Sequence, residues 1–191
     1  MGSERTVREV VDMIVELGLV DRSTPGETFE PDVLDEPLSY YGHTAQEAVL
    51  SLLSELEIRY SFDYKTFRGI DEADDDERLE RYQAELQSIA SCTRGTVTIT
   101  NVRLVENDAE WELRFDCNGE TESWPAYPGD EDEAFEAGLV FATHLAGIPE
   151  NSTQRFCDVD PGDEDVNGEA VFGDPEALNR LGAHFGLTFT P

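Results

Sequence analysis

A loop near the end of the chain carries oxygen ligands at the spacing that calcium-binding loops use. Loop positions 1, 3, 5 and 12 are occupied by Asp163, Asp165, Asn167 and Asp174, and position 6 is occupied by Gly168. Ligands so spaced wrap a hard cation, and the glycine permits the sharp turn. The match to an EF-hand is incomplete, because Pro161 stands where the entering helix would end and the last ligand is Asp rather than Glu. A Ca²⁺- or Mg²⁺-binding module on residues 158–174 is therefore one alternative, beside an ordinary solvated hairpin loop.

Other residues with catalytic chemistry do not form a recognisable motif. His43, His144 and His184 lie far apart in the sequence, and none has a second histidine at metal-ligand spacing. Cys157 is followed by Asp158 and has no basic neighbour that would favour a thiolate. Acidic residues are so numerous that a pair of them does not identify a general acid and base. The sequence therefore favours a non-enzymatic protein without a cofactor, the Ca²⁺ or Mg²⁺ alternative excepted.

Acidic residues also gather in three places that favour protein binding. Strand-like alternation around residues 109–117 sends Glu110, Glu112 and Asp116 to the face opposite the apolar residues. Two further acidic runs precede predicted helices. The residues that we predict as a partner-binding surface are Asp74, Asp75, Asp76, Glu110, Glu112, Asp116, Asp130, Glu131 and Asp132. The alternative is a charged face that is merely solvated.

The net charge limits the class of partner. The chain has 43 acidic and 13 basic residues, which gives a formal charge of −30 at pH 7. Nucleic acids are bound through basic side chains that neutralise phosphates, so direct nucleic-acid binding is excluded, and an anionic membrane surface repels the chain in the same way. A basic protein is the partner that this charge attracts.

Helical periodicity appears in several segments. Residues 6–18 place Val7, Val10 and Ile14 on one apolar stripe, and a second helix opens with a capping box at Thr44 and Glu47. Further helices are expected at about 77–90, 130–147 and 174–185. Residues 22–43 are rich in proline and glycine and predict an irregular connection.

Period-two alternation predicts the strands. The clearest signal covers residues 96–124, with turns at Asn107-Asp108 and Asn118-Gly119. Two-residue turns there pair Leu104 with Trp111 and Leu113 with Trp124. The same register places Glu122 opposite Phe115, an acidic residue against the apolar face. Shorter strands are expected near 58–64, 155–159 and 169–172.

These elements predict an α+β protein. An antiparallel β-meander of about residues 96–124, with the short strands, packs against four to five α-helices. We expect a single domain over residues 1–191, in which an N-terminal helical layer, 1–67, packs on an α+β core, 68–191.

Composition and motifs together favour one function and leave two alternatives open. Three widely spaced cysteines, with neither a signal-peptide pattern nor a long apolar stretch, predict a cytoplasmic protein. The favoured function is an immunity or inhibitor protein that neutralises a basic, nuclease-like partner by charge complementarity or nucleic-acid mimicry. The alternatives are a housekeeping domain whose acidity is an adaptation to high salt, and the Ca²⁺- or Mg²⁺-binding module.

Overall fold

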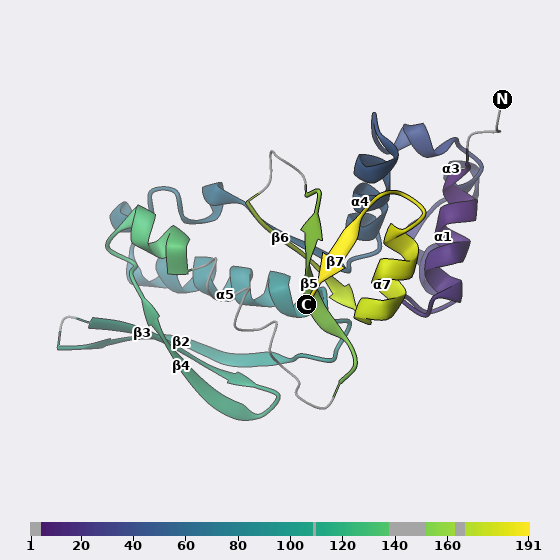
Figure 1. Ribbon diagram of the computed structural model, residues 1–191. Helices are drawn as coiled ribbons and strands as arrows, with labels where there is room; N and C mark the ends of the chain where they lie inside the picture. The colour runs from purple at the N-terminus through teal and green to yellow at the C-terminus, as the bar shows by residue number, and fades with distance from the viewer. Residues whose placement is uncertain (1–4, 109, 138–151, 163–166) are drawn as a thin grey trace. The chain divides into compact units, whose positions relative to one another are not determined.

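The computed structural model describes residues 5–108, 110–137, 152–162 and 167–191, and the chain divides into two compact units. Unit 1 comprises Met1–Tyr60, Asn151–Glu164 and Glu169–Pro191, and unit 2 comprises Ser61–Glu150 and Asp165–Gly168. The purple beginning and the yellow end of the chain therefore belong to the same unit (Figure 1). The expectation of one domain with a helical layer at residues 1–67 stays a prediction.

Unit 1 begins with helices, some of which have side-chain caps at their N-termini and some a proline in the first turn. Its helices are α1 (Val7–Glu16), α2 (Thr24–Thr28), α3 (Pro31–Leu34), the 3₁₀ turn η1 (Leu38–Tyr40), α4 (Ala45–Glu55) and α7 (Pro175–Gly182). The predicted capping box of α4 is present, since Thr44 Oγ1 accepts from the Glu47 amide at 3.1 Å and the Glu47 carboxylate accepts from the Thr44 amide at 3.2 Å. Proline in the first turn initiates α2 and α3, so the connection expected to be irregular is partly helical.

A four-stranded sheet lies mostly in unit 1, although residues 61–62 and 167–168, at the ends of two of its strands, are assigned to unit 2. Its strands are β1 (Arg59–Phe62), β5 (Arg155–Asp160), β6 (Asn167–Gly173) and β7 (Thr188–Thr190), in the order β1-β6-β5-β7. The short strands expected near 58–64, 155–159 and 169–172 are thus confirmed. The buried residues Cys157, Val171 and Phe189 belong to one hydrophobic core with the apolar stripes of α1, α4 and α7. A buried ion pair joins β1 to β6, with Arg59 Nε 2.5 Å from Glu169 Oε1.

Unit 2 contains the predicted antiparallel meander, which confirms the α+β class. Its elements are η2 (Tyr64–Phe67), η3 (Ile70–Glu72), α5 (Asp75–Ser91), β2 (Ile99–Asn107), β3 (Glu110–Cys117), β4 (Glu120–Ala126) and a helical segment at 131–137. The sheet order is β2-β3-β4. α5 lies along the sheet (Figure 1) and buries Tyr82, Leu86 and Ile89.

The second hairpin of the meander has the predicted register. Leu113 lies opposite Trp124, and Phe115 lies opposite Glu122. The Trp124 ring packs edge-on against the Phe115 ring with centroids 4.8 Å apart, so the tryptophan rather than the acidic residue covers the phenylalanine. The predicted register, with Glu122 opposite Phe115, is therefore compatible with an apolar environment for the Phe115 ring.

The first hairpin departs from the predicted register by two residues. Leu104 pairs with Leu113 instead of Trp111, because β2 and β3 stay paired as far as Asn107 and Glu110. The turn therefore begins at Asp108, whose φ of 49° is left-handed. The pairing also shifts between Thr100 and Arg103, at the left-handed Asn101.

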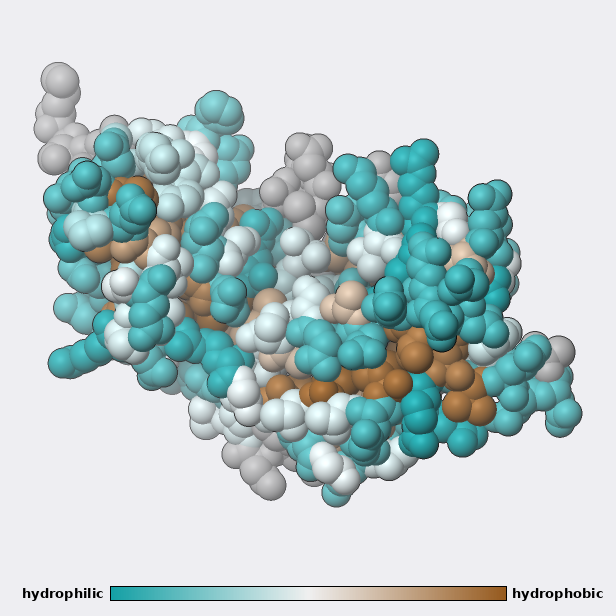
Figure 2. Space-filling model, turned by 180° about the vertical axis from the view of Figure 1, so that it is seen from behind, coloured by the Kyte–Doolittle hydropathy of each residue, from teal (hydrophilic) through white to brown (hydrophobic). Residues whose placement is uncertain are grey.

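Hydrophilic residues cover most of the face seen in Figure 2, and a band of hydrophobic residues runs between them on the side of unit 2. β2 is an edge strand of that unit, and its Val102, Leu104 and Val105 are half-buried. The sheet is thus less fully covered than the core of unit 1, where most of the apolar side chains of α1 and α4 are buried.

One acidic side chain lies inside unit 2 rather than on its surface. Glu85 of α5 is 5% exposed, and burial raises the pKa of its carboxyl from 4.5 to about 7. Between these values the folded chain keeps a proton that the unfolded chain releases. The contribution of Glu85 to stability is therefore full below about pH 4.5 and is lost as the pH rises through about 7.

We predict that Glu85→Gln removes this pH dependence. The free energy of unfolding of E85Q relative to the unsubstituted protein should rise by about 3 kcal/mol between about pH 4 and about pH 8, measured by urea denaturation. The control is Glu80→Gln, which removes a carboxylate from an exposed position of the same helix. Equal pH profiles for the two variants would contradict the prediction.

Candidate functional site

The acidic face of β3 is held in place by hydrogen bonds. Glu112 Oε2 accepts from Arg114 Nε at 2.9 Å, from Arg114 Nη2 at 2.7 Å and from Ser123 Oγ at 3.1 Å. Asp116 accepts from Asn101 Nδ2 at 2.5 Å and from Thr121 Oγ1 at 2.8 Å. The Arg114 bonds chiefly lower the pKa of Glu112, and the Asn101 bond chiefly lowers that of Asp116. Both carboxylates therefore stay ionised well below neutral pH.

The acidic runs that precede helices serve the helices themselves. Asp74 Oδ1 accepts from the Glu77 amide at 2.9 Å, and Asp130 Oδ1 accepts from the amides of Asp132 and Glu133 at 3.0 Å each. Such side-chain caps satisfy amides that have no partner inside the helix. These predicted binding residues thus have a structural role.

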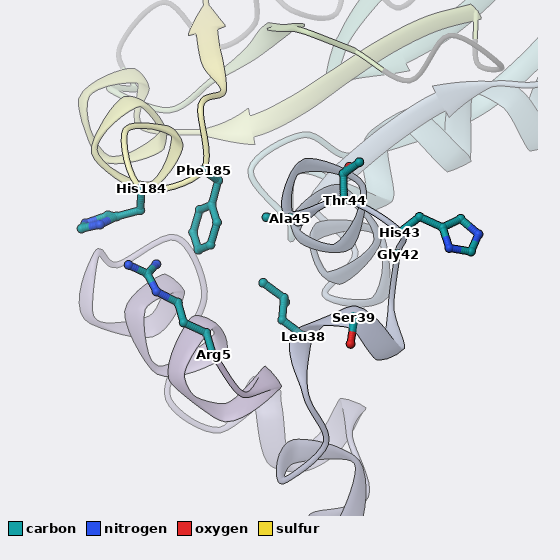
Figure 3. A pocket seen from close by; sticks show the side chains of 9 residues that line it. All are labelled: Arg5, Leu38, Ser39, Gly42, His43, Thr44, Ala45, His184 and Phe185. Carbon is teal, nitrogen blue, oxygen red and sulfur yellow. The ribbon is translucent and has the colours of Figure 1, made fainter. Parts of the chain in front are cut away.

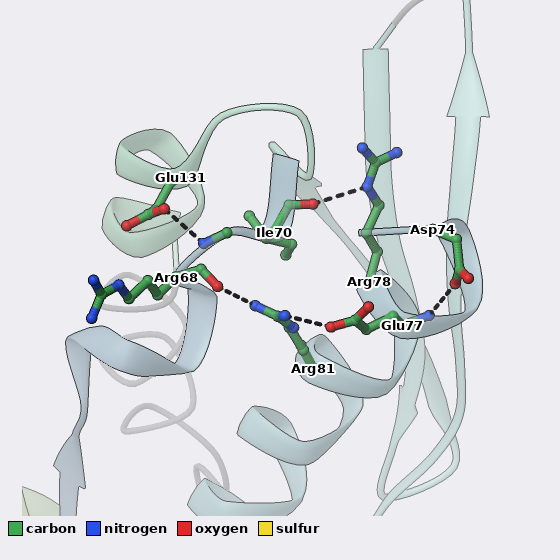
Figure 4. A network of polar contacts seen from close by, with 8 residues as sticks. Arg68, Ile70, Asp74, Glu77, Arg78, Arg81 and Glu131 are labelled. Carbon is green, nitrogen blue, oxygen red and sulfur yellow. Dashed lines mark hydrogen bonds and ion pairs between the residues drawn. The ribbon is translucent and has the colours of Figure 1, made fainter. Parts of the chain in front are cut away.

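A polar network connects the two runs within unit 2 (Figure 4). Glu131 Oε2 accepts from the Gly69 amide at 2.7 Å, which ties segment 131–137 to the turn before η3. Arg81 of α5 donates to the Arg68 carbonyl at 2.6 Å and pairs with Glu77. The ion pair of Asp75 with Arg78 measures 3.2 Å. Asp76 and Asp132 are exposed.

A groove of about 630 Å³ brings some of the predicted residues together with aromatic side chains. Its lining residues are Glu110, Trp111, Glu112, Ser123, Trp124, Pro125, Ala126, Tyr127, Gly129, Asp130 and Glu133. Three predicted binding residues, Glu110, Glu112 and Asp130, line it. The other predicted ones, Asp74, Asp75, Asp76, Asp116, Glu131 and Asp132, are not among its lining residues. No Lys, Arg or His stands among the described residues that line the groove.

The fold forms this groove where β3 begins and β4 ends. Alternate residues of a strand point to opposite faces, so Glu110 and Glu112 come from one face and Trp111 from the other. The chain then leaves β4 through Tyr127, whose amide donates to the buried Tyr82 hydroxyl at 3.2 Å. Burial raises the pKa of Tyr82 to about 12, which keeps this hydroxyl protonated. The groove wall is therefore anchored to α5.

The sequence did not single out the aromatic part of the groove. Alternation assigned Trp111 to the core face, yet it is half-buried, and Tyr127 is 44% exposed. Both tryptophans of the chain line the groove. Tryptophan and tyrosine that stay partly exposed beside acidic residues are the signal that would have found this site.

A second pocket, of about 310 Å³, lies in unit 1, and its basic side chains do not all point toward one place (Figure 3). Arg5, His43, His184 and Phe185 are among its lining residues, and the Arg5 guanidinium lies 5.0 Å from the centroid of the Phe185 ring. In Figure 3 the His43 ring points away from the other labelled side chains. The His43 amide donates to Glu47 Oε2 at 2.8 Å, so the N-terminus of α4 already has an anionic partner.

The proposed metal loop lies partly outside the described residues, and two of its four predicted ligands are among those not described. Asp163 and Asp165 belong to the segment that is not described, as does His144 in another segment. Asn167 belongs to β6, and Asp174 caps α7 by accepting from the Glu176 and Ala177 amides at 3.0 Å each. Within the described part of the chain no group of three His, Cys, Asp or Glu residues is arranged for a metal ion. The metal alternative stays a prediction.

Cys157 is poorly suited to nucleophilic chemistry. Burial, with the charge of Asp158 added to it, raises the pKa of its thiol to about 11. The thiol therefore stays protonated at neutral pH, and a thiolate is the form that attacks.

Comparison with protein-family models, curated proteins and solved structures gave no match. Among the helices that the structure describes, none combines the length and the apolar character needed to cross a membrane.

The cap formed by Asp74 gives a test of its structural role. Asp74→Ala should lower the free energy of unfolding by about 1 kcal/mol, because the Glu77 amide loses its acceptor. Asp74→Asn removes the same charge but keeps a capping oxygen, so its stability should stay close to that of the unsubstituted protein. Equal losses for D74A and D74N, measured by chemical denaturation, would show that the charge of Asp74 rather than its cap matters.

Proposed function

We propose that this protein is a non-enzymatic interaction protein whose partner is a basic protein. The observation that carries the proposal is the groove of unit 2, whose lining includes the acidic residues Glu110, Glu112, Asp130 and Glu133 as well as Trp111, Trp124 and Tyr127. Aromatic side chains supply contact area at binding sites, and the carboxylates select for positive charge. The site thus combines affinity and charge selection.

The charge of the whole chain supports the same partner class. A net charge of −30 steers a basic protein toward the surface and raises its association rate. Glu112 contributes a carboxylate that remains ionised, since hydrogen bonds from Arg114 lower its pKa. The long-range field of the chain and the carboxylates of the groove therefore both favour a basic partner.

The finer form of the proposal is an immunity or inhibitor protein in the cytoplasm. Such a protein would occupy the substrate cleft of a nuclease-like partner, which is basic because it binds phosphates. Carboxylates fixed by caps and hydrogen bonds, such as Glu112, Asp116 and Asp130, can stand in for phosphates at fixed positions. This form rests on charge and on the fixed carboxylates, without a motif.

Charge reversal in the groove tests the proposal. Glu110 and Glu133 are exposed groove residues, and the double variant E110K/E133K should slow association with the partner by about tenfold at low salt. The matched control is E80K/E120K, with the same change of charge at exposed positions outside the groove. The control should slow association by no more than about twofold, because only the long-range field is altered.

The partner is first isolated by affinity capture with the unsubstituted protein and both double variants. A supporting result is a basic protein that the unsubstituted protein and the control retain and that E110K/E133K loses, with association rates then measured on the purified pair. The proposal fails if the retained proteins are not basic, if no protein is retained, or if both double variants bind alike.

A further inference from the structure

We infer that the groove of unit 2 receives an arginine side chain from an exposed segment of the basic partner. This inference rests on the proposed function and adds the chemical group that the groove recognises. It excludes lysine as an equivalent ligand, because the lining of the groove includes aromatic residues as well as acidic ones.

The two kinds of lining residue match the two properties of a guanidinium group. The group is planar and weakly hydrated, so it stacks on aromatic rings, and Trp111, Trp124 and Tyr127 supply such rings. It also donates hydrogen bonds from a rigid fork that suits a carboxylate. A lysine ammonium is a compact, strongly hydrated charge that gains less from the aromatic part.

Two carboxylates of the groove, those of Glu112 and Asp130, are already oriented. The bonds to Arg114 and Ser123 use Oε2 of Glu112, and the amides of segment 131–137 use Oδ1 of Asp130. A ligand therefore does not have to order these two side chains. Binding sites arranged in advance lose less conformational entropy on association.

The aromatic wall is fixed in a similar way. Trp124 rests edge-on against the buried Phe115, and the Tyr127 backbone is held by the Tyr82 hydroxyl. The Tyr127 side chain is nevertheless 44% exposed, so it is open to a ligand. The groove is thus rigid at its base and accessible at its edge.

The volume of the groove suits a side chain with part of its backbone. About 630 Å³ lies within the range of pockets that take small molecules, roughly 300–1,000 Å³. A single inorganic cation would leave most of this space unfilled. An arginine carried on an extended or looped segment fills the groove while its neighbours contact the rim.

Tryptophan emission provides a readout confined to the groove, because both tryptophans of the chain line it. The probes are three blocked pentapeptides, Gly-Gly-X-Gly-Gly, in which X is arginine, lysine or the neutral analogue citrulline. We expect a saturable change of emission with the arginine peptide below about 10 mM, about tenfold weaker binding of the lysine peptide, and no saturation with citrulline.

Variants assign this response to the named residues. Tyr127→Ala should weaken the arginine peptide by about tenfold, whereas Tyr40→Ala, a similarly exposed tyrosine in unit 1, should leave its affinity unchanged. E110Q/E133Q should weaken it as well, and the control E80Q/E120Q should not. Circular dichroism confirms that each variant is folded before its titration.

The inference is overturned by any of three results. These are no saturable response to the arginine peptide, equal affinity for the lysine peptide, or an arginine response that survives both Y127A and E110Q/E133Q. If one of these occurs while E110K/E133K still slows association with the basic partner, the proposed function stands without the arginine. If the peptide binds as expected but no basic protein is captured, the groove recognises arginine and the proposed function fails.

Discussion

The repulsion among carboxylates is the constraint on which the rest of this structure depends. A chain with a formal charge of −30 must fold without bringing its acidic side chains together uncompensated. The helix N-termini meet much of this requirement, because their unpaired amides and positive end accept a negative group. The acidic side chains that occupy such positions are Glu9, Glu47, Asp74, Asp130 and Asp174.

The acidic residues divide into those whose carboxylates the fold holds in place and those whose carboxylates have no partner among the described residues. Caps, the buried pair of Arg59 with Glu169 and the bonds of Asp116 belong to the first group. Glu110 and Glu133 belong to the second, since their side chains make no hydrogen bond or ion pair with another described residue. Both line the aromatic groove.

Local signals predicted the parts of the fold that are local. The capping box at Thr44, the proline-initiated α7 after Asp174 and the hairpin at Asn118-Gly119 each depend on residues within a few positions. The register of the first hairpin was not predicted correctly. Its strands stay paired into the expected turn, as far as Asn107 and Glu110. The register shift at the left-handed Asn101 cannot be recognised from the alternation of apolar and polar residues.

The candidate site was predictable only in part for a related reason. Alternation gives the face of a strand, so Glu110 and Glu112 were identified as outward residues. It does not show where one strand ends beside another, and the groove forms where the start of β3, the end of β4 and segment 131–137 meet. Asp74 caps α5. An acidic run before a helix is compatible with both a binding patch and a cap, so the sequence alone does not separate the two roles, and the binding role of Asp74 stays a prediction.

The most direct test of the central claim is the thermal melting of the protein in about 0.1 M and about 2 M KCl, which span weak and nearly complete screening of surface charge. If caps and hydrophobic cores compensate the repulsion and the remaining acidity serves a partner, the protein is fully folded at the lower concentration and gains little at the higher one. A protein that folds only in molar salt would contradict the claim, since its acidity would then be an adaptation to salt.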